Sequence, residues 1–166
     1  MCNGFVYDTK TSEAFRSKYS TKIDAVVEFI ERCVSEGESV LLAFAFREEA
    51  IWIADKLKKK GITYGSSNSK DFVRRFENKE FDVLMGHPAS IGHGVNLQHA
   101  ARMLVWSSIT YNYELWEQMN ARLIRQGQSK GVQIHVFSAL DTIEQGQYKA
   151  VMKKEKEQNE FLKLTK

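Results

Sequence analysis

Apolar residues along the chain recur in two patterns, one with the period of a helix and one in short continuous runs. Residues 20–37 carry an apolar stripe at helical spacing, open with a capping residue (Ser20 or Thr21) and end at Gly37. Residues 39–46 are a short continuous apolar run, typical of a strand buried on both faces, and residues 81–85 and 102–108 again predict buried strands. The two patterns predict helices packed against a buried sheet.

The alternation of the two patterns continues to the end of the chain. It predicts further helices over 47–61, 69–79 (capped by Ser69), 111–126 and 141–164, and further strands over 62–65 and 132–139. Strand and helix alternate about five times, which requires crossover connections and so an α/β fold with a mostly parallel sheet flanked by helices. Ligands bind such sheets beyond the carboxyl ends of the strands, here loops 46–48, 65–69, 86–98 and 107–112. The first nineteen residues show no steady period and predict an irregular lead-in.

The composition of the chain is that of a globular domain without a membrane-spanning segment. The chain has 166 residues, 43% hydrophobic and 27% charged, with one proline and a net charge of +3, as expected for one globular domain that tolerates an anionic partner. Cys2 and Cys33 form no C-x-x-C pair and suit a reducing compartment. No apolar run has the length of a membrane span and the N-terminus lacks a signal peptide's apolar core, so we expect a cytoplasmic protein without a membrane partner.

A glycine-rich segment follows the apolar run 81–85. Gly86, Gly92 and Gly94 either bring backbone N–H groups close to an anion or simply form a flexible connection. A complete ATP site also needs a Walker A lysine, and none of the ten glycines is followed by lysine. The chain by itself therefore predicts at most half of an ATPase centre.

The histidines do not predict a metal site. His87, His93 and His99 recur every six residues, which matches no common zinc spacing. His135 lies inside a predicted strand, where a structural histidine with a hydrogen-bond partner is expected. We therefore expect no bound metal in this chain.

The stretch 118–128, QMNARLIRQGQ, combines two arginines with amide side chains. Gln118, Arg122 and Arg125 stand at i, i+4 and i+7, which places them within about 60° on a helix. Helical spacing alone leaves two interpretations open. They form either an ordinary solvated face or a set of cationic donors aimed at one ligand.

Several motifs resemble those of the second, C-terminal lobe of superfamily-two helicases, and among them the Swi/Snf-type DNA translocases. VLLAFAF resembles motif IV, and SIGHGVNLQHA resembles motif V, A-G-G-x-G-L-N-L-x-x-A. YNYELWEQMNARLIRQGQ resembles W-N-P-x-x-x-x-Q-x-x-x-R-x-x-R-x-G-Q, which contains motif VI, and GITYGSSNSKDFVRRFEN resembles a stretch near the nucleic-acid backbone. The similarity covers residues 20–145 and suits a compact bacterial or phage-like member.

The resemblance implies a fold and a domain organisation. The fold would be a three-layer RecA-like lobe of the P-loop NTPase type over residues 20–145, with 1–19 as an interlobe lead-in and 146–166 as a C-terminal helix. The lobe would belong to an ATP-dependent DNA helicase or translocase acting on duplex DNA. ATP and Mg would be held mainly by an N-terminal lobe outside this chain, so the chain alone should be inactive.

The resemblance also implies roles for individual residues. Arg125 would be the arginine finger, Arg122 its companion, and Gln118 would orient the set, because an arginine at the γ-phosphate stabilises the charge of phosphoryl transfer. The remaining residues divide into a nucleotide set and a nucleic-acid set. The nucleotide set is Gly92, Gly94, Asn96 and Gln128, and the nucleic-acid set is Ser90, His93, Arg47 and Ser67.

The chain departs from the family pattern in three places. His87-Pro88 replaces the Ser-Thr that precedes motif V, Ile91 replaces its first glycine, and residues 111–113 read Tyr-Asn-Tyr instead of Trp-Asn-Pro. These departures affect the DNA contacts more than the arginines. Two alternatives stay open: an RNA helicase lobe, and a non-catalytic nucleic-acid-binding or regulatory module.

Overall fold

The structure is a computed structural model that describes residues 3–91, 95–125 and 131–164. Its strands are β1 (Phe5–Tyr7), β2 (Ala14–Arg16), β3 (Val40–Ala43), β4 (Tyr64–Ser66), β5 (Val83–Gly86), β6 (Met103–Trp106) and β7 (Gln133–Val136). Its helices are α1 (Thr21–Ser35), α2 (Arg47–Lys59), α3 (Phe72–Glu77), α4 (Tyr113–Asn120) and α5 (Ile143–Leu164). No helix in the described part of the chain is both long and apolar enough to cross a bilayer.

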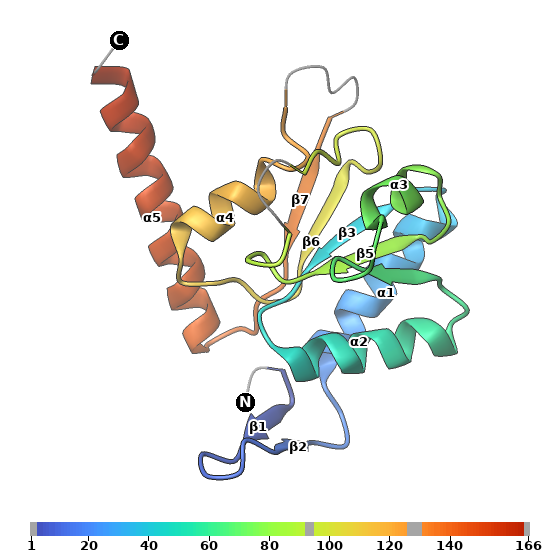
Figure 1. Ribbon diagram of the computed structural model, residues 1–166. Coiled ribbons are helices and arrows are strands. Elements are labelled where there is room, and N and C mark those ends of the chain that lie inside the picture. The colour runs from blue at the N-terminus through green and yellow to red at the C-terminus, as the bar shows by residue number, and fades with distance from the viewer. Residues whose placement is uncertain (1–2, 92–94, 126–130, 165–166) are drawn as a thin grey trace.

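Five strands form one parallel sheet in the order β4-β5-β3-β6-β7. Helices cover both of its faces (Figure 1), with α1 and α2 packed on one side and α3, α4 and α5 on the other. This is the three-layer α/β arrangement that the alternation of strand and helix predicts. The carboxyl ends of β3, β4, β5 and β6 lie at one edge of the sheet, because neighbouring strands are parallel.

The central strands are buried on both faces, as their continuous apolar runs predict. In β3, Val40 and Leu42 pack with α1 and α2, while Leu41 and Ala43 pack with the helices of the opposite face. All four side chains are fully buried. Each such aliphatic side chain stabilises the fold by about 1.5–3 kcal/mol relative to its exposed state, so these strands hold the three layers together.

The ends of α1 and α2 agree with the sequence signals. The Ser20 side chain accepts a hydrogen bond from the Ile23 N–H and caps α1. Gly37 and Gly61 have φ values of +80° and +72° just after α1 and α2, a left-handed conformation that glycine adopts without strain. These signals are local in the chain, which is why they could be predicted from the sequence.

Two local predictions are wrong. Residues 5–16 form an antiparallel hairpin, with Val6 opposite Phe15, where an irregular lead-in was expected. The Asp8 carboxylate accepts hydrogen bonds from two backbone N–H groups of the connecting turn, a common turn device of aspartate. Ser69 does not cap α3: its hydroxyl donates to the Ser66 carbonyl, and Asp71, with a φ of 57°, occupies the N-cap position.

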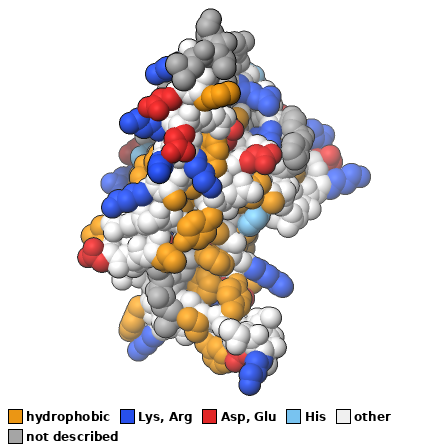
Figure 2. Space-filling model, turned by 90° about the vertical axis from the view of Figure 1, so that its left-hand side faces the viewer, with side chains coloured by type: hydrophobic (Ala, Val, Ile, Leu, Met, Phe, Trp, Pro, Cys, Tyr) orange, Lys and Arg blue, Asp and Glu red, His pale blue; other side chains and the backbone are white. Residues whose placement is uncertain are grey.

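The long C-terminal helix packs on the rest of the lobe in its first half and carries exposed charges in its second half. Val151 is buried against the sheet, and the later turns carry ion pairs at i, i+4 spacing, Lys153–Glu157 and Lys156–Glu160. Figure 2 shows charged side chains of both signs over the upper part of this side of the molecule and hydrophobic side chains below them. The described lysines from 153 onward are exposed, so the end of this helix presents a solvated face.

Candidate functional site

The segment after β5 and the segment after α4 are joined by two hydrogen bonds. The Arg122 Nη1 donates to the Val95 carbonyl oxygen at 3.2 Å. In return, the Leu97 N–H donates to the Arg122 carbonyl oxygen at 3.1 Å. The glycine-rich segment and the arginine-bearing segment are far apart in the sequence. The structure therefore fixes them to each other through both a side-chain and a backbone hydrogen bond.

Arg122 and Arg125 differ in their surroundings. Arg122 is only 5% exposed, whereas Arg125 is exposed. Burial lowers the pKa of Arg122, and the charge of Arg125 lowers it further. Within residues 3–91, 95–125 and 131–164 no carboxylate forms an ion pair with either guanidinium. Two neighbouring cations without an acidic partner produce a local positive potential that favours an anionic ligand.

The two arginines do not share a helix face, which corrects the expectation from helical spacing. α4 ends at Asn120, whose side-chain oxygen accepts a hydrogen bond from the buried Trp106 indole at 3.0 Å. Residues 121–124 continue as turns, with the Leu123 and Ile124 N–H groups both bonded to the Asn120 carbonyl. The turn directs Arg122 into the protein and leaves Arg125 at the surface.

Gln118 is not brought to the arginines. Its amide donates to the Glu114 carboxylate, one turn earlier in α4, at 3.0 Å. In the described part of the chain it makes no hydrogen bond to either guanidinium. Its predicted role in orienting the arginines stays a prediction.

Of the predicted nucleotide set, only Asn96 lies within the described residues. Its side-chain oxygen accepts a hydrogen bond from the Gln98 N–H at 3.1 Å, which shapes the turn beside Leu97. Gly92, Gly94 and Gln128 lie outside the described residues, as does His93 of the predicted nucleic-acid set. The contact between Asn96 and its own loop agrees with a part in shaping that loop.

Three residues of the predicted nucleic-acid set lie at the carboxyl edge of the sheet. Ser67 follows β4, Ser90 follows β5, and Arg47 begins α2 after β3, and these strands are neighbours in the sheet. The hydroxyl oxygens of Ser67 and Ser90 lie 2.9 Å apart. Ser90 and Arg47 are exposed, whereas Ser67 is largely buried. The fold therefore presents a hydroxyl pair and a cation at one edge.

Gly86 allows this close packing. A Cβ atom at Gly86 would lie 2.5 Å from the Ile91 Cδ1 and 3.1 Å from the Ser67 hydroxyl oxygen. Any larger residue would displace the Ile91 side chain, which is buried here. Glycine is thus required for steric reasons at the end of β5, which explains one of the glycines that suggested an anion-binding loop.

The sequence comparisons point to helicases. No protein-family model matches the chain. The chain is 28% identical over 134 residues to an uncharacterized ATP-dependent helicase of Mycoplasma pneumoniae and 28% identical over 137 residues to transcription termination factor 2 of Drosophila melanogaster. In each case 76% of this chain matches 13% of the relative. It is also 28% identical over 130 residues to the putative protein p41 of Acyrthosiphon pisum secondary endosymbiont phage 1, with 74% of this chain matching 27% of that protein.

The solved structures show the same fold. The C-terminal part of the Fun30 ATPase domain superposes with a TM-score of 0.71 at 21% identity, over 82% of this chain and 48% of that one. The Hef helicase domain of Pyrococcus furiosus superposes with a TM-score of 0.57 at 18% identity, over 76% of this chain and 27% of that one. The chain has the fold of a RecA-like helicase lobe and is a distant relative of the C-terminal lobes of Swi/Snf-type ATPases and other superfamily-two helicases. It spans less than half the length of each of these proteins.

The lobe also contains a buried ionic network that the sequence did not reveal. The Lys22 ammonium contacts the Glu144 carboxylate at 2.5 Å and the Ser108 hydroxyl at 3.1 Å, and Ser108 donates to Glu49 at 2.8 Å. The network joins α1, α2, the end of β6 and the start of α5 beneath the carboxyl edge. The sequence carries only a weak sign of this network, which is that Lys22, Glu49 and Glu144 each stand beside the apolar positions of a helix.

Glu49 is the most deeply buried acid of this network. Its side chain is 0% exposed and accepts hydrogen bonds from the Ala45 and Phe46 N–H groups. Burial raises the pKa of this carboxyl, and the nearby Lys22 ammonium opposes that rise. The carboxyl fixes the loop that leads into Arg47, so the network has a structural part in placing the carboxyl edge.

His135 has the structural role that its position in a strand predicts. Its Nε2 lies 3.3 Å from the Gln133 side-chain oxygen, and its ring packs against Phe29 with 4.4 Å between centroids. Burial lowers its pKa. In the described ranges, no group of three or more His, Cys, Asp or Glu side chains could hold a metal ion.

Proposed function

We propose that this lobe is part of an ATP-dependent DNA translocase and supplies Arg125 and Arg122 to a nucleotide held by a first lobe. The observation that carries the proposal is the arginine pair itself. Arg122 is fixed to the loop at Val95, while Arg125 is exposed beside it and has no acidic partner in the described part of the chain. An exposed, unpaired guanidinium beside an anchored one suits a group that reaches across a cleft to a phosphate.

The chemistry assigned to the pair is stabilisation of charge on the transferred phosphoryl group. Arg125 acts as the arginine finger at the γ-phosphate, and Arg122 holds the motif V loop in place. Asn96, Gly92 and Gly94 of that loop, and Gln128 at the end of motif VI, would contact the nucleotide. ATP and Mg are held mainly by the first lobe, because this chain has no Walker A lysine. Gln118 would join the arginines only when the lobes close.

The nucleic-acid part of the proposal rests on the carboxyl edge. Ser67 and Ser90 present a hydroxyl pair, and Arg47 stands after the neighbouring strand. Hydroxyls, backbone N–H groups and arginines are the usual ligands of DNA phosphates. Duplex DNA is the proposed partner at this edge, and closure of the two lobes around ATP would move it relative to the first lobe.

The arginine finger is tested by Arg125→Ala in a protein that joins this lobe to a first lobe carrying a Walker A loop. We expect DNA-stimulated ATP turnover to fall by a factor on the order of 10³ while ATP affinity changes little. The matched control is Lys153→Ala, which removes one exposed cation of α5 and should leave turnover unchanged. Wild-type turnover in Arg125→Ala would refute the assignment.

Two further measurements complete this test. The 166-residue chain alone should hydrolyse no ATP, and measurable turnover that is lost in Arg125→Ala would contradict the two-lobe proposal. Stimulation of the joined protein by duplex DNA, single-stranded DNA and RNA should be strongest with duplex DNA. Stronger stimulation by RNA would favour an RNA helicase instead.

A further inference from the structure

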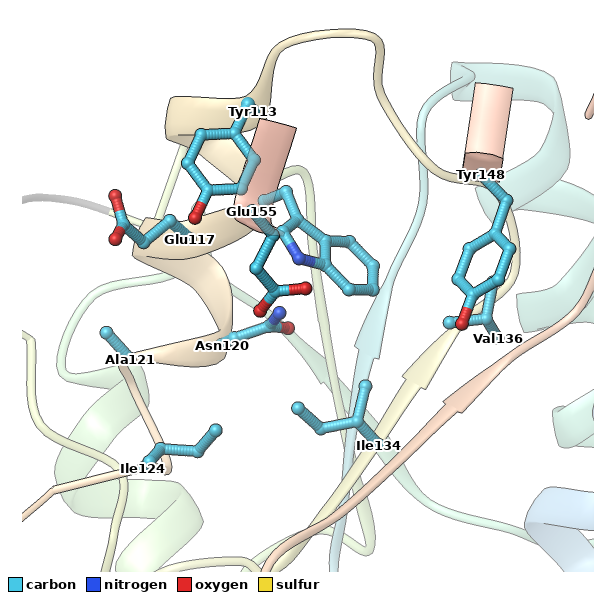
Figure 3. Close-up of a pocket in the computed structure, with 10 residues that line it drawn as sticks. Tyr113, Glu117, Asn120, Ala121, Ile124, Ile134, Val136, Tyr148 and Glu155 are labelled. Carbon is cyan, nitrogen blue, oxygen red and sulfur yellow. The ribbon is translucent and has the colours of Figure 1, made fainter. Parts of the chain in front are cut away.

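A cavity of about 400 Å³ opens between α4, β7 and α5, and Ala121 and Ile124 of the turn that carries the arginine pair also line it. Figure 3 shows Tyr113 and Glu117 entering it from α4, Tyr148 and Glu155 from α5, and Ile134 and Val136 from the edge strand. The cavity thus combines aromatic rings, two carboxylates and an aliphatic floor. The proposed ATPase chemistry gives this cavity no role.

The Trp116 indole lines the same cavity with an unused hydrogen-bond donor. Its side chain is 4% exposed and packs on Trp106, with 4.8 Å between ring centroids. The Trp106 indole N–H is bonded to Asn120, but the Trp116 Nε1 is buried and has no hydrogen-bond partner among the residues that the structure describes. Burying an N–H without an acceptor costs about 1–3 kcal/mol, so an acceptor delivered through the cavity would recover free energy.

The cavity also carries uncompensated negative charge. Glu117 accepts a hydrogen bond from the Gln158 amide at 3.2 Å, and neither Glu117 nor Glu155 forms an ion pair with a lysine or arginine of the described ranges. Burial raises the pKa of the Tyr113 phenol, and the charges of Glu117 and Glu155 raise it further. Both carboxylates therefore act on the same space, and carboxylates beside aromatic rings favour a cation.

We propose that this cavity binds a lysine or arginine side chain presented by a segment of a partner protein. The cationic head would lie between Glu117, Glu155 and the tyrosine rings, and its methylene stem would pack on Ile134 and Val136. A peptide carries a carbonyl acceptor beside every side chain, which is what the Trp116 N–H requires. A polyamine offers the same charge but no acceptor, so the unused donor favours a protein segment.

The experiment follows the indole N–H signals of the 166-residue chain, which has three tryptophans, by two-dimensional ¹H–¹⁵N NMR. The Trp116 signal is assigned by its loss in Trp116→Phe. The probes are acetyl-Ala-Lys-Ala-amide, its arginine counterpart, and a norleucine counterpart that keeps the stem without the charge. We expect the lysine and arginine peptides to shift the Trp116 signal. The norleucine peptide should bind at least about tenfold more weakly than either of them.

Two variants locate the charge effect. Glu155→Gln should weaken binding of the lysine and arginine peptides about threefold or more. Glu160→Gln removes the same charge from an exposed position on the same helix and should change binding less than about twofold. Equal weakening by both variants would show general attraction to an acidic helix and would overturn the site.

Three other outcomes would also overturn the proposal. In the first, the norleucine peptide binds as well as the lysine peptide. In the second, spermidine shifts the Trp116 signal at a lower concentration than either basic peptide. In the third, no peptide shifts the signal up to about 10 mM, since binding weaker than this is too weak for a specific pocket. None of these measurements involves ATP or DNA. Failure here would leave the proposed translocase function intact, and failure of that function would leave this site intact.

Discussion

The Nη1 of Arg122 lies 3.2 Å from the carbonyl oxygen of Val95, so a buried guanidinium ties the end of α4 to the segment after β5. The backbone returns the contact through the Leu97 N–H and the Arg122 carbonyl. Arg125, three residues later, is exposed. One arginine of the pair therefore has a structural part in the isolated lobe, and the other lies at the surface.

This difference predicts unequal effects of the two arginines on stability. Arg122→Ala removes a charged hydrogen-bond donor and leaves the Val95 carbonyl without it, so we expect a loss of about 1–3 kcal/mol in the free energy of unfolding. Arg125→Ala removes an exposed side chain and should change it by less than about 0.5 kcal/mol. Urea unfolding of the two variants and the wild type measures both values. Equal losses in the two variants would contradict the division of roles.

The sheet and its core could be predicted because their signals are local. The continuous runs around Leu41, Leu84 and Leu104 specify strands buried on both faces, and Ser20 and Gly37 mark the ends of a helix without reference to the rest of the fold. The end of α4 could not be predicted in this way. It coincides with the pairing of Asn120 with the Trp106 indole, which depends on where β6 lies relative to the helix.

The candidate site likewise has a part that the sequence predicted and a part that it did not. The arginine pair was found through its resemblance to motif VI, but helical spacing alone placed Arg122 and Arg125 on one face, whereas Arg122 is buried against Val95 and Arg125 is exposed. Trp116 gave no functional signal, because an apolar residue at helical spacing indicates a core position. Only the placement of β7 and α5 shows the cavity beside it.

The tight packing at Gly86 predicts a steric effect. Gly86→Ala would place a Cβ atom 2.5 Å from the Ile91 Cδ1, and we expect a destabilisation of about 1–3 kcal/mol from the forced shift of Ile91. Gly146→Ala is the matched control, since Gly146 lies in α5 with nothing within 4 Å of a new Cβ. That control should gain about 0.5–1 kcal/mol. Thermal unfolding of both variants tests the contrast, and a stable Gly86→Ala protein would show that Ile91 does not restrain this position.

The buried carboxyl of Glu49 predicts a dependence of stability on pH. The pKa of Glu49 is raised in the folded protein above the ordinary value of 4.5. At pH values between the ordinary pKa and the raised one, the folded state therefore holds a proton that the unfolded state has lost. This contribution favours folding below that ordinary value and is lost as pH rises through the raised pKa. Glu49→Gln removes the titration, so its stability relative to the wild type should improve as pH rises from about 4.5 to about 7. Urea unfolding across that range measures the difference, and a difference independent of pH would show that Glu49 keeps its ordinary affinity for protons.

The carboxyl edge predicts a salt-dependent contact with DNA. If Arg47 neutralises one phosphate, Arg47→Ala should weaken binding of the joined two-lobe protein to duplex DNA and reduce the slope of log affinity against log salt by about one. The loss should be similar for unrelated DNA sequences, because a phosphate contact carries no base information. Arg75→Ala is the matched control: Arg75 lies in α3, is partly exposed, and is paired at 2.7 Å with Glu80, which follows that helix. Its removal should leave the slope unchanged. Fluorescence anisotropy with a labelled duplex at several salt concentrations gives both slopes, and an unchanged slope in Arg47→Ala would remove Arg47 from the proposed DNA contact.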